Sequence, residues 1–304
     1  MVSAAVVDAV ATAGFVAGVA DLNEVRATDP GRVRRLLAAR RRRPLLGPDG
    51  KLMIIACDHP ARGALGAGGK PYAMASRTDL LNRLVAALAH PGVDGLLATA
   101  DIVEDLLLLG ALENKVVLAS MNRGGLQGSV FEMDDRLTGY DVPGVIEGGL
   151  DGGKMLVRID LDDPGTVATL ELTGRAVSEL SRAERVAMVE PFLSMRRDGK
   201  VVNDLSPEGV IRSVHIAAGL GASSAYTWLK LPVVRDMARV MDATTLPTLL
   251  LGGDPEGAPE ETYAAWRAAL ALPSVRGLVL GRTMLYPSDD DVARAVDTAA
   301  SLVR

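Results

Sequence analysis

The chain has 304 residues, and its 33 basic and 38 acidic side chains give a formal net charge of −5. This balance excludes a nucleic-acid-binding domain whose affinity depends on a high positive charge. Apolar residues make up 48% of the chain and aromatic residues only 3%, so the core must consist mainly of Val, Leu, Ile and Ala. Such a composition suits parallel strands that are buried on both faces. The single cysteine, Cys57, excludes a disulfide framework within the chain and fits a reducing compartment.

Residues 1–48 are expected to form a helical N-terminal extension, with an apolar stretch over residues 4–20. A helix start at Asp29-Pro30 leads into a basic run that ends with Arg40 to Arg43. This run predicts a solvated helix end before Pro44, because arginines at the carboxyl end of a helix suit its dipole. Contact with nucleic acid or an anionic membrane is the less favoured alternative.

No segment predicts a membrane span or a secretion signal. No run reaches about 18 uninterrupted apolar residues. The N-terminal stretch lacks a basic leading region and carries Asp8 among its apolar residues. We therefore expect a cytoplasmic protein that binds neither membranes nor nucleic acid.

Residues 49–304 are expected to form one domain in which strands and helices alternate. Eight short β-branched or aliphatic runs occupy residues 52–57, 94–99, 115–120, 154–159, 185–190, 225–230, 247–252 and 277–281. Helical patterns lie near 76–89, 101–112, 143–149, 164–182, 206–219, 232–243, 259–271 and 288–303. Strict alternation requires parallel strands, and eight units in about 250 residues predict a (β/α)8 TIM barrel. A doubly wound open sheet is the alternative, but no GxGxxG motif follows the first run.

Lys230 is the most informative residue at a predicted strand end. Only 6 residues of the chain are lysines, and Lys230 closes the sixth run, before a proline, Pro232, that is expected to open the next helix. Burying an ammonium group is costly unless it is paired or neutral, and burial or a second cation favours the neutral amine. A neutral amine attacks carbonyl groups. Lys230 is therefore the candidate nucleophile for a Schiff base.

Three further charged residues lie at predicted strand ends or starts. Lys154 begins the fourth run and could favour the neutral form of Lys230 from there, or form a surface salt bridge. Glu190 could be a carboxylate with a raised pKa that exchanges protons with a substrate hydroxyl, or an ion-pair partner of an arginine. Asp58 could shuttle protons or cap the turn that follows the first run.

The last two runs indicate a phosphate site. The seventh run ends in Gly252-Gly253 and the eighth in Gly281-Arg282. The loops after the seventh and eighth strands of TIM barrels commonly bind phosphate through backbone amides. The arginine adds a fork suited to an oxyanion. These residues predict a phosphorylated ligand.

Together these residues resemble the class I aldolases related to tagatose-bisphosphate, sulfofructosephosphate and deoxyribose-phosphate aldolases. The resemblance covers roughly residues 50–303. The Schiff-base lysine of that family falls on Lys230, its Glu-Pro glutamate on Glu190, its second lysine on Lys154 in KMLVRID, and its aspartate on Asp58 in ACDHPARG. The strings TGYD at 138–141 and Gly281-Arg282 also look like the family.

The pattern is most similar to actinobacterial barrel proteins associated with myo-inositol breakdown. That resemblance implies cleavage of 5-dehydro-2-deoxy-D-gluconate 6-phosphate into dihydroxyacetone phosphate and malonate semialdehyde. It implies no metal and no organic cofactor. We also expect a homo-oligomer. The segments 67–77 and 121–135 depart from the sugar-bisphosphate members, which leaves aldolases for other phosphosugars open as alternatives.

Three other functions compete with the Schiff-base aldolase. A metal-dependent aldolase would need a cluster of ligands, but the three histidines, His59, His90 and His215, show no convergent pattern. A phosphosugar isomerase on the same barrel would use Glu190 as its base and need no lysine nucleophile. A non-catalytic regulator that binds a phosphosugar could keep the phosphate loops, but would have less reason to keep both lysines and Glu190.

Overall fold

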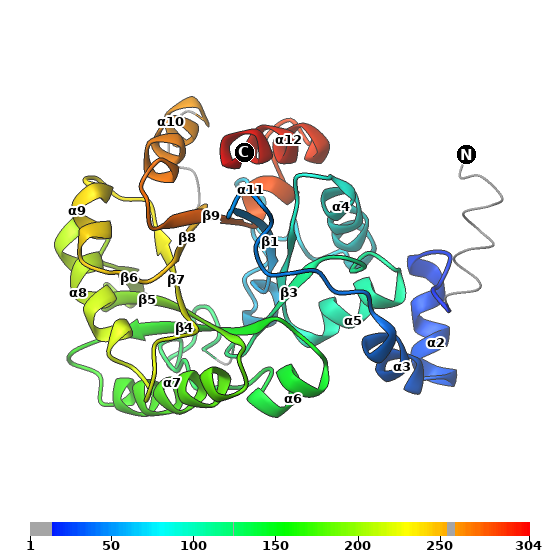
Figure 1. Cartoon of the computed structure of the whole chain (residues 1–304), viewed down its shortest axis with the longest axis horizontal. Coiled ribbons are helices and arrows are strands. Elements are labelled where there is room, and N and C mark those ends of the chain that lie inside the picture. The colour runs from blue at the N-terminus through cyan, green and yellow to red at the C-terminus, as the bar shows by residue number, and fades with distance from the viewer. Residues whose placement is uncertain (1–13, 124, 254–258) are drawn as a thin grey trace.

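The computed structural model describes residues 14–123, 125–253 and 259–304. Its centre is a ring of eight parallel strands, in which each strand pairs with the next and the last pairs with the first. In order around the ring they are β1 (Leu52–Cys57), β2 (Gly95–Ala98), β3 (Val116–Ser120), β4 (Gly152–Ile159), β5 (Val186–Arg197), β7 (Thr227–Pro232), β8 (Thr248–Leu251) and β9 (Val275–Leu280). Helices surround this ring (Figure 1). The predicted (β/α)8 TIM barrel is confirmed.

The helices follow the strands in chain order and cover the outside of the barrel. They are α4 (Arg77–Ala89), α5 (Ala100–Leu108), α6 (Val142–Glu147), α7 (Gly165–Arg182), α8 (Pro207–Ala218), α9 (Met237–Asp242), α10 (Pro259–Leu270), α11 (Arg282–Leu285) and α12 (Val292–Val303). The side chain of Ser206 caps α8 by accepting from Gly209 N–H, as its Ser-Pro-Glu sequence predicts. No helix within the described ranges is long and apolar enough to span a bilayer.

Alternation of side chains along each strand divides the core in two. The inward residues form one apolar cluster: Leu52, Ile54, Ala56, Leu97, Val116, Leu118, Val186, Met188, Trp228, Leu249 and Val279. The outward residues pack against the helices in a much larger cluster. Because side chains alternate with a period of two, the next inward positions toward the carboxyl ends of β5 and β7 are residues 190 and 230.

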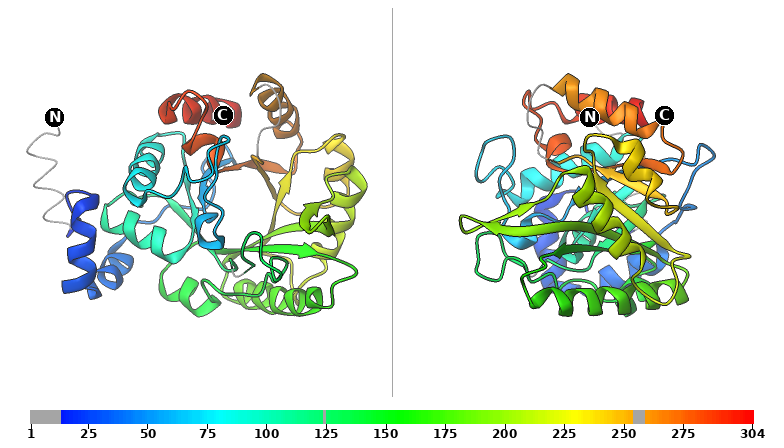
Figure 2. Two further views of the ribbon diagram at one scale, coloured as in Figure 1. Left: turned by 180° about the vertical axis from the view of Figure 1, so that it is seen from behind. Right: turned by 90° about the vertical axis from the view of Figure 1, so that its left-hand side faces the viewer.

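A hairpin that the sequence analysis did not predict extends one side of the barrel mouth. β5 continues past Glu190 to Arg197, and β6 (Lys200–Asn203) returns antiparallel to it. Asp198 and Gly199 form the two-residue turn, both with positive φ (52° and 73°), which matches the twist of a tight hairpin. The hairpin projects beyond the ring in the right-hand view of Figure 2.

The N-terminal extension is helical only in part. A 3-10 turn, η1 (Val19–Asp21), leads into α2 (Leu22–Thr28) and α3 (Gly31–Ala39), which lie beside α5 on the outside of the barrel (Figure 1). Residues 14–18 and 40–45 are not helical, so the predicted helix is wrong there. The first part of the apolar stretch, residues 4–13, lies outside the described residues.

The predicted solvated helix end at Arg40 to Arg43 is wrong in part, because α3 ends at Ala39 and only Arg41 and Arg42 of this run are exposed. Arg40 is buried and donates to the carbonyl oxygens of Lys115 and Gly149. Arg43 Nη1 lies 2.5 Å from Asp94, whose other oxygen accepts from the backbone N–H at the start of β1. These arginines therefore hold the amino ends of the barrel strands together, opposite the mouth.

Gly277 offers a test of the contact that closes the ring. It pairs with Leu52 across β9 and β1 and has φ 141°, and an added Cβ would overlap the Leu52 carbonyl oxygen. Gly277→Ala should therefore lower the free energy of unfolding by roughly 2 kcal/mol or more in urea titrations. Gly219→Ala is the control, because its added Cβ meets nothing closer than 3.7 Å. Equal stability of the two variants would show that β1 and β9 can separate without cost.

Candidate active site

Four charged residues singled out by the sequence meet inside the barrel. Glu190 of β5 lies between two lysines: Lys154 Nζ is 2.9 Å from Glu190 Oε2, and Lys230 Nζ is 2.9 Å from Glu190 Oε1. Lys154 Nζ is also 2.8 Å from Oδ2 of Asp58, which follows β1. All four residues are buried, and Lys154 and Asp58 are 0% exposed. One carboxylate is therefore shared by two ammonium groups.

Arg123 completes this set from the loop after β3. Its Nε donates to Asp58 Oδ2 at 2.9 Å, and its Nη2 contacts the same oxygen. Ser120 Oγ donates to that oxygen at 3.0 Å. The result is a buried ionic chain in which three cations alternate with two carboxylates. In order, its members are Arg123, Asp58, Lys154, Glu190 and Lys230.

Strand register explains why these side chains converge. β5 pairs with β7 so that Val189 lies opposite Leu229, which places Glu190 and Lys230 side by side. In β4, Leu156 is the residue opposite Glu190, so Lys154 lies one inward position below it and its long side chain extends toward the mouth. Because side chains alternate along each strand, Lys154 reaches the Glu190 carboxylate from one inward position below it, whereas Lys230 reaches it from the side.

Two predictions about the lysines are wrong in detail. Lys154 has no exposed surface, so a surface salt bridge is excluded. Lys230 does not end its strand, because β7 continues through Pro232 and α9 begins only at Met237. The proline can occupy the strand end because it lies at the last position of β7.

The charges of the ionic chain determine the protonation state of the Glu190 and Asp58 carboxylates. Burial alone would raise the pKa of Glu190, but Lys154, Lys230 and Arg123 outweigh it and lower that pKa to about 2. The raised pKa expected for Glu190 is therefore wrong. Burial also opposes ionisation of Asp58, yet Arg123 and Lys154 hold its pKa well below the ordinary value. Burial, followed by Arg123, lowers the pKa of Lys154 despite its two carboxylate partners.

A cavity of about 630 Å³ opens at the mouth of the barrel. Lys230 and Glu190 line it, and so do all four residues of the predicted phosphate set, Gly252, Gly253, Gly281 and Arg282. Asp58 and Lys154 lie beneath this lining. The structure thus places the candidate nucleophile and the candidate phosphate site in one cavity.

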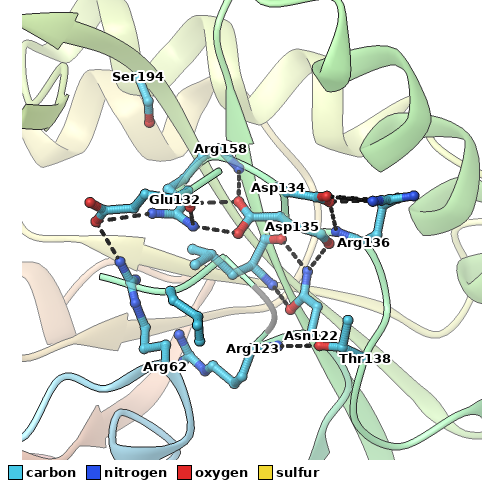
Figure 3. A network of polar contacts seen from close by, with 12 residues as sticks. Arg62, Asn122, Arg123, Glu132, Asp134, Asp135, Arg136, Thr138, Arg158 and Ser194 are labelled. Atoms are coloured by element: carbon cyan, nitrogen blue, oxygen red, sulfur yellow. Dashed lines mark hydrogen bonds and ion pairs between the residues drawn. The ribbon is translucent and has the colours of Figure 1, made fainter. Parts of the chain in front are cut away.

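A second group of charged residues, which the sequence alone did not indicate, lines the cavity. Arg62, Arg123, Glu132 and Arg158 line it as well and belong to a network that Figure 3 shows. Arg158 could have been found, since it lies four residues after Lys154 in the same strand and therefore faces inward. Arg62 and Glu132 come from loops, where alternation gives no signal. Two of these residues, Arg123 and Glu132, lie in segment 121–135, where the sequence was expected to differ from the sugar-bisphosphate aldolases.

The histidine nearest the site is neutral. His59 follows Asp58 and lines the cavity. Burial lowers its pKa to about 3, with contributions from Arg123 and Arg282 that Asp58 only partly offsets. Within the part of the chain that the structure describes, no three His, Cys, Asp or Glu side chains are grouped so as to hold a metal ion.

The low pKa of Glu190 predicts how stability depends on pH. The folded protein keeps Glu190 charged where the unfolded chain, with an ordinary value of 4.5, is protonated. This contribution is present above about pH 4.5 and is lost as the pH falls toward 2, with a slope of up to about 1.4 kcal/mol per pH unit. Glu190→Gln should remove that slope between about pH 5 and pH 3. It should also cost roughly 3–5 kcal/mol at neutral pH, because two ammonium groups lose their shared partner.

Urea unfolding at a series of pH values measures both effects. The exposed Glu147→Gln on α6 is the control and should leave the slope unchanged. Identical slopes for Glu190→Gln and the unaltered protein would show that Glu190 is not charged in the folded state at low pH.

Comparison with known proteins identifies the family to which this chain is similar. Residues 50–300 match the Cgl0159-like family. The crystal structure of Cgl0159 from Corynebacterium glutamicum has a TM-score of 0.92 and 56% sequence identity, over 95% of this chain and 98% of that one. The comparison with curated proteins gives no match.

Two more distant structures share the barrel fold. A Schiff-base-forming fructose-1,6-bisphosphate aldolase has a TM-score of 0.63 and 19% identity, over 90% of this chain and all of that one. An archaeal fructose-1,6-bisphosphate aldolase, with its catalytic lysine covalently bound to the carbinolamine intermediate, has a TM-score of 0.62 and 17% identity, over 89% of this chain and 99% of that one. With a family match across most of its length, the chain belongs to the Cgl0159-like family.

Proposed function

We propose that the protein is a class I aldolase that cleaves a phosphorylated keto sugar or keto sugar acid through a Schiff base on Lys230. The observation that carries this proposal is the Glu190 carboxylate, which lies 2.9 Å from the Lys230 amine and 2.9 Å from that of Lys154. An isomerase needs a carboxylate base but no lysine beside it. The barrel shared with Schiff-base aldolases supports the proposal at the level of fold.

The first step forms the covalent intermediate. Glu190 takes a proton from the Lys230 ammonium group, and the free amine then attacks the ketone carbon of the substrate. The carbonyl oxygen receives that proton back from Glu190, and Glu190 then removes a proton from the attached nitrogen, which gives a neutral carbinolamine. Glu190 returns this second proton to the carbinolamine oxygen, which leaves as water, and a positively charged iminium ion remains. The iminium is the electron sink, so no step of the reaction requires a metal or an organic cofactor.

The second step breaks the carbon–carbon bond. Glu190 removes the proton of the hydroxyl beyond that bond, the hydroxyl carbon becomes an aldehyde, and the bonding electrons pass to the iminium to form an enamine. The pKa of Glu190 depends on which intermediate is attached to Lys230. Conversion of Lys230 into the neutral carbinolamine removes one of the three cations that lower the Glu190 pKa, so Glu190 holds a proton more readily at that stage and can deliver it to the leaving water. Formation of the iminium restores the positive charge beside Glu190.

Lys154 and Asp58 act on Glu190 rather than on the substrate. Both are fully buried beneath the cavity lining. We therefore revise the predicted roles: Lys154 orients Glu190 and keeps it charged, instead of acting on Lys230, and Asp58 holds Lys154 in place instead of shuttling protons. Arg123 fixes Asp58 in turn.

The phosphate of the substrate would bind to Gly252, Gly253, Gly281 and Arg282. Binding energy at this remote group can orient the reacting carbons over Lys230. The resemblance to proteins of myo-inositol breakdown leads us to propose 5-dehydro-2-deoxy-D-gluconate 6-phosphate as the substrate. Its cleavage would give dihydroxyacetone phosphate and malonate semialdehyde. Another phosphosugar of the tagatose-bisphosphate, sulfofructosephosphate or deoxyribose-phosphate type is the alternative.

Borohydride trapping tests the nucleophile. Treatment with borohydride and dihydroxyacetone phosphate should add the mass of the reduced ligand to the peptide that contains Lys230, because reduction makes the iminium permanent. Mass spectrometry of the digested protein measures this. Lys230→Met should abolish the label, whereas Lys70→Met, a surface control, should keep it. A label on Lys154, or no label on the unaltered protein, would overturn the assignment, and the second result would favour a non-catalytic regulator.

Arg282→Ala tests the phosphate site. It should remove a charge-assisted contact worth about 1.5–3 kcal/mol, which corresponds to about a tenfold to hundredfold loss in kcat/KM for a phosphorylated substrate. A non-phosphorylated analogue should lose little, since that contact is never made. Steady-state kinetics of both substrates on both proteins give a double-mutant cycle, with the exposed Arg212→Ala as control. Equal losses for the two substrates would place the phosphate elsewhere.

A further inference from the structure

The second charged group in the cavity lies across the mouth from the predicted phosphate site. Gly252-Gly253 and Gly281-Arg282 follow β8 and β9, the seventh and eighth strands of the ring. Arg123 follows β3 and Arg158 lies in β4, the third and fourth strands, which are on the opposite side of an eight-stranded ring. Arg62, from the loop after β1, reaches the same group through Glu132 (Figure 3).

Arg123 and Arg158 are already held by carboxylates of the protein. Asp58 binds Arg123 through two N–H groups. Asp135 binds Arg158 through Nε at 2.9 Å and Nη2 at 2.6 Å. The positions of these two arginines are therefore fixed by the protein, and both line the same cavity as Arg62.

Arg62 is different, because part of its guanidinium has no partner. Nη2 lies 2.9 Å from Glu132 Oε1. Its Nε is buried and has no hydrogen-bond partner among the residues that the structure describes. Burial and the adjacent Arg158 and Arg123 lower the pKa of Arg62, and Glu132 only partly offsets them. A buried, unpaired donor on a cation costs free energy unless an acceptor reaches it.

The charge of the whole cavity also favours an anion. Its lining includes five cationic side chains, Arg62, Arg123, Arg158, Lys230 and Arg282, and two carboxylates, Glu132 and Glu190. Asp58, Asp135 and Lys154 contact these side chains from beneath, so the difference is 6 − 4 = +2 in a chain whose formal net charge is −5. On the β3 and β4 side each arginine faces one carboxylate, so the unpaired Nε of Arg62 is what favours an acceptor there.

We propose that Arg62 binds a carboxylate of the substrate, at the end remote from the phosphate. A carboxylate fits better than a second phosphate because Glu132 stays beside Arg62, and its repulsion grows with the charge of the ligand. The planar fork of a guanidinium also matches a carboxylate. This inference rests on the proposed function and narrows its substrate class to phosphorylated keto sugar acids. The aldehyde released on cleavage then carries the carboxylate, and Arg62 determines specificity for it.

Binding of an unreactive probe tests Arg62 without any turnover. 3-Hydroxypropionate carries the carboxylate, and propane-1,3-diol is its neutral match. Calorimetric or NMR titration should show saturable binding of 3-hydroxypropionate that Arg62→Met weakens about tenfold or more, whereas propane-1,3-diol should bind to neither protein. Arg212→Met on the exposed face of α8 should change nothing. Glu132→Gln, which removes the repelling charge, should bind the carboxylate at least as tightly as the unaltered protein.

Three results of these titrations would overturn the proposal. They are absence of saturable binding, equal affinity in Arg62→Met, and equal affinity for the neutral diol. Thermal unfolding of each variant shows whether it is folded. Arg62→Lys, which keeps the charge but not the fork, should retain part of the affinity if Arg62→Met proves unstable.

Acceptor specificity in the synthetic direction gives the second test. With dihydroxyacetone phosphate as donor, the unaltered protein should prefer malonate semialdehyde over propanal about tenfold to hundredfold in kcat/KM, and Arg62→Met should remove that preference while leaving propanal unchanged. An Arg62-dependent preference for glyceraldehyde 3-phosphate would instead indicate a phosphate and overturn the carboxylate. Equal losses for all acceptors would reduce Arg62 to a structural role.

The two proposals fail in distinguishable ways. If borohydride still labels Lys230 in Arg62→Met but the acceptor preference is absent from the unaltered protein, the inference about Arg62 fails and the aldolase stands. If Lys230 cannot be labelled at all, the aldolase fails, and the probe titrations still decide whether Arg62 binds a carboxylate.

Discussion

The sharing of one buried carboxylate by two lysines is the interaction on which the rest of the site depends. Glu190 holds Lys154 and Lys230 at 2.9 Å each, in an interior where an unpaired ammonium group would be costly. A carboxylate with two cationic partners stays charged, which keeps it ready to accept a proton. When either lysine becomes neutral, that balance changes at once. On the proposed function, the site would therefore link the charge of Lys230, the nucleophile, to the strength of Glu190 as a base.

That interaction needs support from beneath, and Arg123 and Asp58 supply it. Asp58 takes one side of the Lys154 ammonium group, so that Lys154 cannot turn away from Glu190. Arg123 in turn holds Asp58. The strands fix the backbone of the lysines and the glutamate, since β4 and β5 are paired through Lys154 and Glu190, and β7 is paired with β8 through Lys230. The two lysines and the glutamate therefore stand on strands, which hold them more precisely than loops would, while Asp58 and Arg123 follow directly on the ends of β1 and β3.

How much of this could be predicted from sequence depends on whether a residue lies on a repeating element. Lys154, Glu190 and Lys230 lie on strands whose alternating pattern already predicts an inward side chain, so charge within an apolar run was enough to find them. The β5–β6 hairpin and the place of Pro232 in β7 were missed, because both strands continue beyond the end of the apolar run that predicted them. The burial of Arg40 and the place of Arg62 in the cavity were missed for another reason. Their partners, the carbonyl groups of Lys115 and Gly149 and the side chain of Glu132, are distant in sequence, and only tertiary structure brings them together.

The charge balance of the cavity connects stability with recognition. The ionic chain has three cations and two carboxylates, and its excess positive charge is buried. Without a ligand, this excess positive charge lowers the free energy of unfolding, because the cations repel one another and are removed from solvent. On the proposed function, an anionic substrate would supply the missing negative charge, and binding would regain the free energy that the fold gives up at this site. On the two proposals, such a site would select ligands by charge before it selects them by shape. Arg282 and Arg62 would then determine which way round a ligand with both a phosphate and a carboxylate lies over Lys230.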